Sequence, residues 1–173
     1  SPVPIAVEGD CTPRPEGLVL LLSGEDTPED RLGTNSVAWS GVPAYETGLV
    51  GRAIALRQSD AYLSVQDHPS LNPTNGFTVG LWLYREGAVG TADIVVSKRE
   101  ADDKPGAGFT LEFAYWQADL LYFRVWTSEG MKTSNPLPVP YATWCYVTGT
   151  YDPSASNGDN IRVGVNGVFS PPK

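Results

Sequence analysis

The chain has few basic residues. In 173 residues, 12 Lys and Arg stand against 20 Asp and Glu, and the formal net charge is -8 at pH 7. Nucleic-acid binding depends on clustered Lys and Arg that replace the counterions of the phosphate backbone, and no such cluster occurs. The sequence therefore predicts no nucleic-acid partner, and its negative charge also disfavours anionic membrane surfaces.

Long hydrophobic runs are also lacking. The longest purely aliphatic stretch is Leu18–Leu22, whereas a membrane-spanning helix needs about 20 apolar residues. Membrane insertion is therefore not expected. The stretch is bounded by Gly17 and Ser23-Gly24, which favours a short central strand covered on both faces.

Histidine and cysteine are scarce. The single histidine, His68, follows Asp67 in an expected turn, and without a recognisable nucleophile it is predicted to be a surface turn residue. The two cysteines, Cys11 and Cys145, are compatible with one long-range disulfide in an oxidising compartment, and equally with two buried thiols that do not react.

Turn formers and aromatic residues are abundant, with 18 Gly, 15 Pro, 5 Trp and 8 Tyr. This composition favours short strands joined by tight connections, and no stretch shows a sustained helical period. Strands about every ten residues are typical of a two-sheet sandwich. The predicted fold class is therefore all-β, an antiparallel β-sandwich.

Local patterns place the expected elements. Residues 1–16 carry four prolines and are predicted to form an arm or linker, while residues 17–173 are expected to form one domain. A polar loop is expected from residue 25 to about 41 and a helical turn at 69–73.

The segments 51–56 and 61–65 are expected to be adjacent strands across a hairpin-like connection, as are 109–116 and 120–126. The expected strands are 18–22, 51–56, 61–65, 77–84, 94–98, 109–116, 120–126, 144–151 and 160–165.

Three stretches carry a family resemblance. They are Gly51–Leu56 followed by Asp60–Val65, then Phe77–Leu83, and finally Trp144–Asp152 followed by Ile161–Gly167. Their order and spacing resemble the laminin-G-like branch of the concanavalin A-like lectin/glucanase domains, which is also similar to pentraxins. The resemblance implies a jelly-roll sandwich in an extracellular or cell-surface protein.

The resemblance also implies an incomplete domain. Such domains continue past the Val-Asn-Gly hairpin with several more strands, and here the sequence ends at Lys173. The domain is therefore expected to be cut short, or to receive its last strands from another chain. In the second case the edge of strand 18–22 would accept a neighbouring subunit.

Catalysis is not expected. Glucanase relatives of this fold hydrolyse glycosidic bonds with closely spaced carboxylates on one strand. Here Glu8 and Asp10 lie in the Pro-rich arm without a third carboxylate, and Glu112 stands alone on its strand. The sequence therefore predicts a protein that is not an enzyme.

Calcium is a candidate ion. The loop from Asp26 to Asn35 offers hard oxygen donors, with glycine to let carbonyl groups converge. Laminin-G-like domains often hold calcium near this corner, so the resemblance implies Asp26, Asp30 and Asn35 as ligands. The alternative is a solvated acidic loop.

A sugar-binding face is predicted on the hairpin of residues 109–126. Alternation assigns one apolar face to the core, formed by Phe109, Leu111, Phe113, Leu121, Phe123 and Val125. The opposite face combines aromatic surface with charged groups, which suits the C–H face and the hydroxyls of a sugar. Its residues are Glu112, Trp116, Tyr122, Arg124 and Trp126. The alternatives are a face packed beneath a loop and a protein interface.

Two functions follow from these patterns. The first is an extracellular, non-catalytic module that binds a glycan or polysaccharide, with calcium as a stabilising ion. The second is a structural or adhesive module that binds other protein subunits, or domains of the same parent protein, through its aromatic face and open strand edge.

Overall fold

The structure, a computed structural model, describes residues 13–73, 75–87, 93–99, 108–115, 117–155 and 160–173. The chain divides into two compact units, residues 1–71 and 72–173. Among the described residues the elements are strands and one 3-10 turn, so the all-β prediction is confirmed. Most of the predicted arm, residues 1–12, lies outside the described residues, and the boundary at 16–17 stays a prediction.

The first unit contains two small antiparallel pairs. Its elements are β1 (Val37–Ser40), β2 (Tyr45–Thr47), β3 (Arg52–Ile54), β4 (Tyr62–Val65) and the turn η1 (Pro69–Leu71). β1 pairs with β4, and β2 pairs with β3. The Trp39 indole Nε1 donates a 3.0 Å hydrogen bond to the Tyr45 hydroxyl, which ties the two pairs together. The helical turn predicted at 69–73 is confirmed by η1.

The strand predicted at 18–22 is wrong. Leu22 makes an isolated bridge with Asp30, and no named strand includes the segment. The backbone groups of Leu21 bond to the following loop: its N–H donates to the Asp30 carboxylate at 3.0 Å, and its carbonyl accepts from the Arg31 N–H at 2.8 Å. The apolar run is therefore held by a loop and a carboxylate.

The hairpin predicted between 51–56 and 61–65 is wrong as well. Both segments form strands, β3 and β4, but each pairs with an earlier strand. Those earlier strands are β1, which lies inside the loop expected at 25–41, and β2. Alternation identified the strands but carried no information about their pairing.

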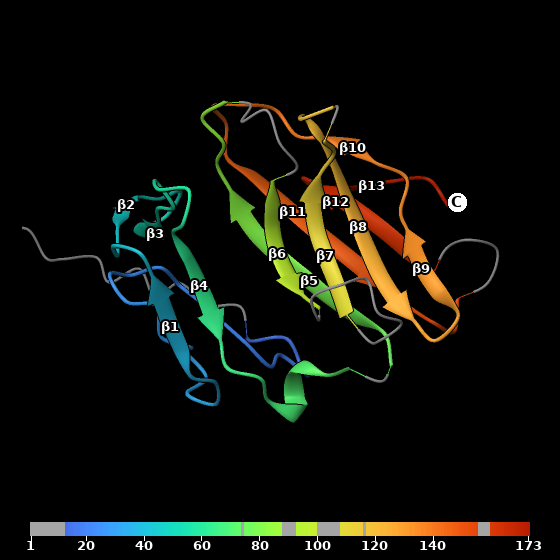
Figure 1. The fold of residues 1–173 in the computed structure, drawn as a ribbon, viewed down its shortest axis with the longest axis horizontal. Coiled ribbons are helices and arrows are strands. Elements are labelled where there is room, and N and C mark those ends of the chain that lie inside the picture. The colour runs from blue at the N-terminus through green and yellow to red at the C-terminus, as the bar shows by residue number, and fades with distance from the viewer. Residues whose placement is uncertain (1–12, 74, 88–92, 100–107, 116, 156–159) are drawn as a thin grey trace, which may run out of the picture. The chain divides into compact units, whose positions relative to one another are not determined.

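The second unit is a two-sheet sandwich, as predicted. One sheet has five strands in the order β10-β8-β7-β6, with β9 also paired to β8, and the other has four in the order β13-β12-β11-β5. Figure 1 shows the two layers, with β6 to β9 in front of β5, β11 and β12. The strands are β5 (Phe77–Leu83), β6 (Ile94–Lys98), β7 (Gly108–Phe113), β8 (Leu120–Thr127), β9 (Gly130–Thr133), β10 (Leu137–Pro138), β11 (Cys145–Tyr151), β12 (Ile161–Val165) and β13 (Val168–Phe169).

The hydrophobic core lies between these sheets. The predicted apolar face of the β7–β8 hairpin is confirmed, because Leu111, Phe113, Leu121, Phe123 and Val125 are buried and Phe109 packs against them. β11 and β12 supply the opposite wall with the buried residues Cys145, Val147, Ile161, Val163 and Val165. Removal of this apolar surface from water is the main stabilising contribution to the sandwich.

Aromatic rings fill the centre of the core. Phe77 lies 5.1 Å from Phe109 and 5.9 Å from Phe123, measured between ring centres. On the facing sheet, Gly149 leaves room for Phe123, since a Cβ built at residue 149 would lie 2.3 Å from that ring. Glycine at this position therefore sets how closely the two sheets pack.

Candidate functional site

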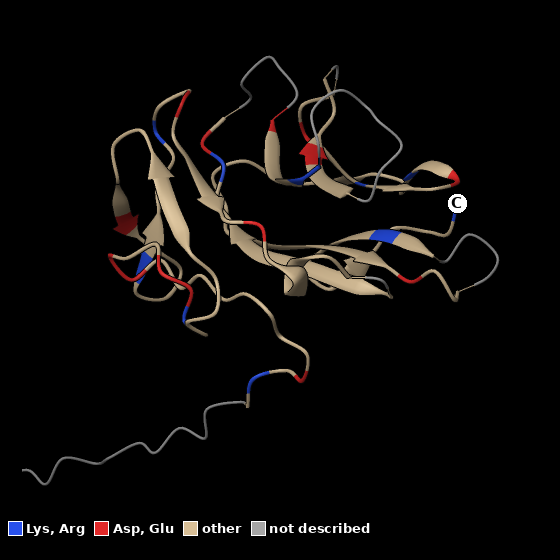
Figure 2. Cartoon of the chain, turned by 60° about the horizontal axis from the view of Figure 1, so that its bottom comes forward, with Lys and Arg blue, Asp and Glu red and all other residues tan. Residues whose placement is uncertain are grey.

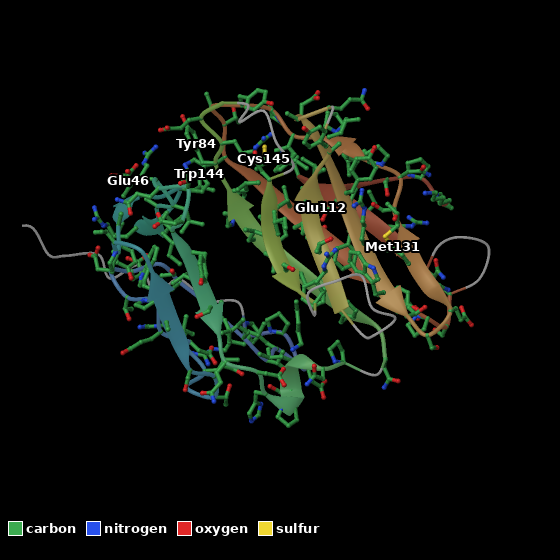
Figure 3. The ribbon with its side chains drawn as sticks, in the orientation of Figure 1. Glu46, Tyr84, Glu112, Met131, Trp144 and Cys145 are labelled. Carbon is green, nitrogen blue, oxygen red and sulfur yellow. The ribbon has the colours of Figure 1, made fainter. Side chains whose placement is uncertain are left out.

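The described members of the predicted sugar-binding set lie on the outer face of the five-stranded sheet. On this face Glu112 is opposite Tyr122, and Thr110 is opposite Arg124. Figure 3 shows Glu112 on β7 and Met131 on β9. Trp116 lies outside the described residues. We call the described part of this surface the polar face, formed by Thr110, Glu112, Tyr122, Arg124 and Trp126.

An ion pair occupies the centre of the polar face. The Arg124 guanidinium Nη1 donates to the Glu112 carboxylate, and the guanidinium lies 5.8 Å from the centre of the Tyr122 ring. The Glu112 side chain is 10% exposed and that of Arg124 is 31% exposed. Since Glu112 faces a guanidinium, this arrangement is not the pair of carboxylates that glycoside hydrolysis uses.

Two polar atoms of this face are buried without a partner. They are the Thr110 hydroxyl Oγ1 and the Arg124 Nε, and they belong to residues directly opposite each other on β7 and β8. A buried polar atom without a hydrogen bond costs about 1–3 kcal/mol, and such atoms are rare in folded proteins. The polar face therefore has unused hydrogen-bonding capacity.

Trp126 is not open as a stacking surface. It is 9% exposed, and the Arg99 guanidinium lies 4.8 Å from its ring centre. A sugar stacks on an aromatic ring whose flat face is accessible. For Trp126 the structure favours the alternative that the ring is packed beneath neighbouring residues.

A second surface gathers aromatic side chains on the outer face of the four-stranded sheet. Trp82 lies directly opposite Tyr146, with ring centres 5.4 Å apart. Tyr84 and Trp144, beside each other in Figure 3, have ring centres 5.5 Å apart. Trp82, Tyr84 and Tyr146 are 52%, 42% and 40% exposed. We call these four residues the aromatic platform.

Sequence reasoning missed the aromatic platform as a site. Alternation in 77–84 separates Trp82 and Tyr84 from the core residues Phe77, Leu81 and Leu83 and places both on one face. The pairing of β5 with β11, strands more than 60 residues apart in the chain, is what adds Trp144 and Tyr146. The sequence pattern does not contain the register of β5 against β11, and that register is what brings the four rings together.

The predicted calcium ligands do not form an open site. The Asp30 carboxylate accepts hydrogen bonds from the backbone N–H groups of Leu21, Leu32, Thr34 and Asn35, and from the side chains of Thr34 and Asn35. Burial raises the pKa of Asp30, but these hydrogen bonds outweigh it and hold the pKa well below its usual range. The donors point hydrogen atoms at the oxygens that calcium would need.

The other two predicted ligands differ. Asp26 pairs with the Arg52 guanidinium at 3.1 Å. The Asn35 amide Nδ2 donates to the Val19 carbonyl at 2.8 Å, while its Oδ1 is buried without a hydrogen-bond partner. Among the described residues, no group of three or more His, Cys, Asp or Glu side chains is arranged to hold a metal ion. These residues do not fit a calcium site as they stand, and calcium binding stays a prediction.

The predicted disulfide involves one described residue. Cys145 is fully buried in the core, where its thiol is free within the described part of the chain. Cys11 lies outside the described residues. The pairing of Cys11 with Cys145 therefore stays a prediction.

Comparison with known proteins found one family. The family model described as the concanavalin A-like lectin/glucanases superfamily, a laminin-G model, matches residues 57–170. No curated protein and no solved structure matches the chain. In the described part of the chain, no helix has the length and apolar character needed to cross a membrane.

Proposed function

Because the chain belongs to the laminin-G-like family of the concanavalin A-like lectin/glucanases superfamily, we propose that it is an extracellular, non-catalytic module that binds a carbohydrate on its polar face. Members of this superfamily commonly bind carbohydrates or proteins, and laminin-G-like domains are generally non-catalytic and typically extracellular. Beyond these family properties, we propose that the ligand is a carbohydrate and that it binds the polar face.

The observation that carries the proposal is the pair of unpartnered polar atoms. The Thr110 hydroxyl can donate and accept, and the Arg124 Nε can donate. Both atoms are buried in the free protein, so a sugar hydroxyl would meet them once binding displaces the atoms that cover them. Such a ligand would offset the cost that the free protein bears for leaving the two atoms unsatisfied.

The neighbouring groups support the same ligand class. The ion pair holds the Glu112 carboxylate beside the Arg124 guanidinium, so an acceptor and a donor lie next to each other. Tyr122 adds a half-buried ring with a hydroxyl at its edge. Adjacent hydroxyls of a sugar pair well with a carboxylate and a guanidinium, because each hydroxyl is both donor and acceptor.

The test is titration calorimetry of the full chain with a panel of soluble oligosaccharides, including neutral and acidic sugars. The double variant Glu112→Gln with Arg124→Met removes both charges together, so neither is left buried and unpaired. We expect it to weaken binding about tenfold or more while the chain stays folded. Arg57→Met is the matched control, because Arg57 forms an exposed ion pair with Glu46 in the first unit.

Protein binding is the competing function. The sequence predicts two routes for it, the aromatic face of the 109–126 hairpin and an open edge at strand 18–22. The segment 18–22 forms no strand, which removes the second route and leaves the first as a prediction. The proposal fails if no sugar of the panel binds. It also fails if the double variant and the control Arg57→Met both bind sugar as tightly as the wild type.

A further inference from the structure

We propose that the aromatic platform is a second, independent carbohydrate site that binds the flat C–H face of a neutral, extended polysaccharide chain. It uses the outer face of the four-stranded sheet, whereas the polar face belongs to the five-stranded sheet. The two sites can therefore be tested independently.

The rings of the platform form a short row. Trp82 and Tyr146 make one cross-strand pair. Tyr84 and Trp144, each two residues from it and just beyond the ends of β5 and β11, make the next ring pair. Two residues of a strand span about 6.6 Å. The row is therefore long enough to contact more than one sugar unit, which favours a polymer over a single monosaccharide.

Two glycines on this face leave room for neighbouring aromatic rings to lie against the sheet. A Cβ built at Gly80 would lie 2.5 Å from the Tyr146 hydroxyl, so the Tyr146 ring leans across the sheet over Gly80. In the same way, Phe169 lies over Gly164, where a Cβ would come within 3.0 Å of its ring. Within the two pairs the rings are tilted by 56° and 51°, so each ring offers its own face, and a ring face matches the C–H face of a sugar.

The charge of this face favours a neutral ligand. β5 and β11 contain no charged residue. Arg162 on β12 shares the face, and the exposed carboxylates Glu86 and Asp152 continue the alternation beyond the ends of β5 and β11. Figure 2 shows the strands of the sandwich mainly in tan, with few charged residues. An acidic polysaccharide would need several cations here.

Hydroxyl groups border the rings. Thr78 on β5 and Thr148 and Thr150 on β11 alternate with core residues and so share the face with the platform. The hydroxyls of Tyr84 and Tyr146 and the indole N–H of Trp82 add polar groups at ring edges. Sugars need this combination, since their hydroxyls take hydrogen bonds while their C–H groups stack on rings.

The experiment is native affinity electrophoresis of the full chain through gels that contain a soluble neutral glucan, a neutral mannan or polygalacturonate. We expect retardation by at least one neutral polymer. Trp82→Ala should weaken that retardation about tenfold. Gly80→Ala should weaken it too, because the new methyl group meets the far end of the Tyr146 side chain and lifts the ring, without a clash in the core.

Controls separate this site from the polar face. Tyr62→Ala removes an aromatic side chain that is 55% exposed on β4, and should leave retardation unchanged. If no neutral polymer retards the wild type, or if the double variant Glu112→Gln with Arg124→Met abolishes retardation while Trp82→Ala does not, the platform is not the site. A change of oligomeric state in Trp82→Ala, measured by light scattering, would show a protein interface and overturn the inference.

Discussion

The Arg85 guanidinium lies 3.5 Å from the centre of the Phe113 ring, inside the sandwich rather than in solvent. It donates to the Ala118 carbonyl at 2.8 Å, pairs with Asp93 at 3.3 Å and lies 4.8 Å from the Tyr141 ring centre. Arg85 follows β5, so this one side chain connects the four-stranded sheet to the five-stranded sheet.

We expect Arg85→Met to lower the free energy of unfolding by about 1–3 kcal/mol. The methionine keeps the aliphatic contacts but leaves the Ala118 carbonyl without its donor and Asp93 without its partner. Urea denaturation followed by circular dichroism measures the change. Arg52→Met is the control, because the Arg52 pair with Asp26 is exposed and should contribute less than about 1 kcal/mol. Equal losses in the two variants would contradict the role assigned to Arg85.

Gly149→Ala should destabilise the sandwich by about 1–3 kcal/mol, because the added methyl group would enter the Phe123 ring and force the sheets apart. Thermal denaturation of the variant and the wild type compares them directly. Gly87→Ala is the matched control and should leave the melting temperature nearly unchanged, since a Cβ at residue 87 meets nothing within 4 Å. An unchanged melting temperature in Gly149→Ala would mean that the core tolerates wider sheet spacing.

Asp30 should make the stability of the chain depend on pH in the acidic range. Its pKa is lower in the folded chain than in the unfolded chain, so the unfolded chain takes up the proton first as pH falls. The stabilisation is present above the unfolded pKa of about 4 and is lost as pH drops below it toward the folded pKa. The difference in urea midpoint between wild type and Asp30→Asn should therefore shrink from pH 7 to pH 3.

The corresponding control is Asp60→Asn, an exposed carboxylate. Its difference from the wild type should be small, because the side chain is exposed. If the Asp30→Asn difference stays constant with pH, the hydrogen bonds to Asp30 do not depend on its charge.

Calcium should leave the melting temperature unchanged if the donors around Asp30 keep their hydrogen bonds, because an ion that binds the folded state must raise it. Thermal melts with calcium and with a chelator measure this. A rise with calcium that Asp26→Asn abolishes would establish the calcium site that the sequence predicts.

Much of the second unit was predictable from alternation. The pattern in 109–126 identified the core residues Phe113 and Phe123, and both are buried. Local patterns worked here because β7 and β8 are joined by a short turn, so neighbours in sequence are also neighbours in the sheet. The first unit was less predictable, since β1 pairs with β4 across more than 20 residues.

The sequence by itself determined the all-β class, the family, and the division of the β7–β8 hairpin into a core face and an outer face, because these depend on composition and on a period of two residues. Tertiary structure alone decided which side chains the outer faces present and which it buries. It buried Trp126 beneath Arg99, bonded Asp30 to the loop around it, and brought Trp82 beside Tyr146. Those outcomes depend on strand register and on packing between distant segments, which no local pattern records.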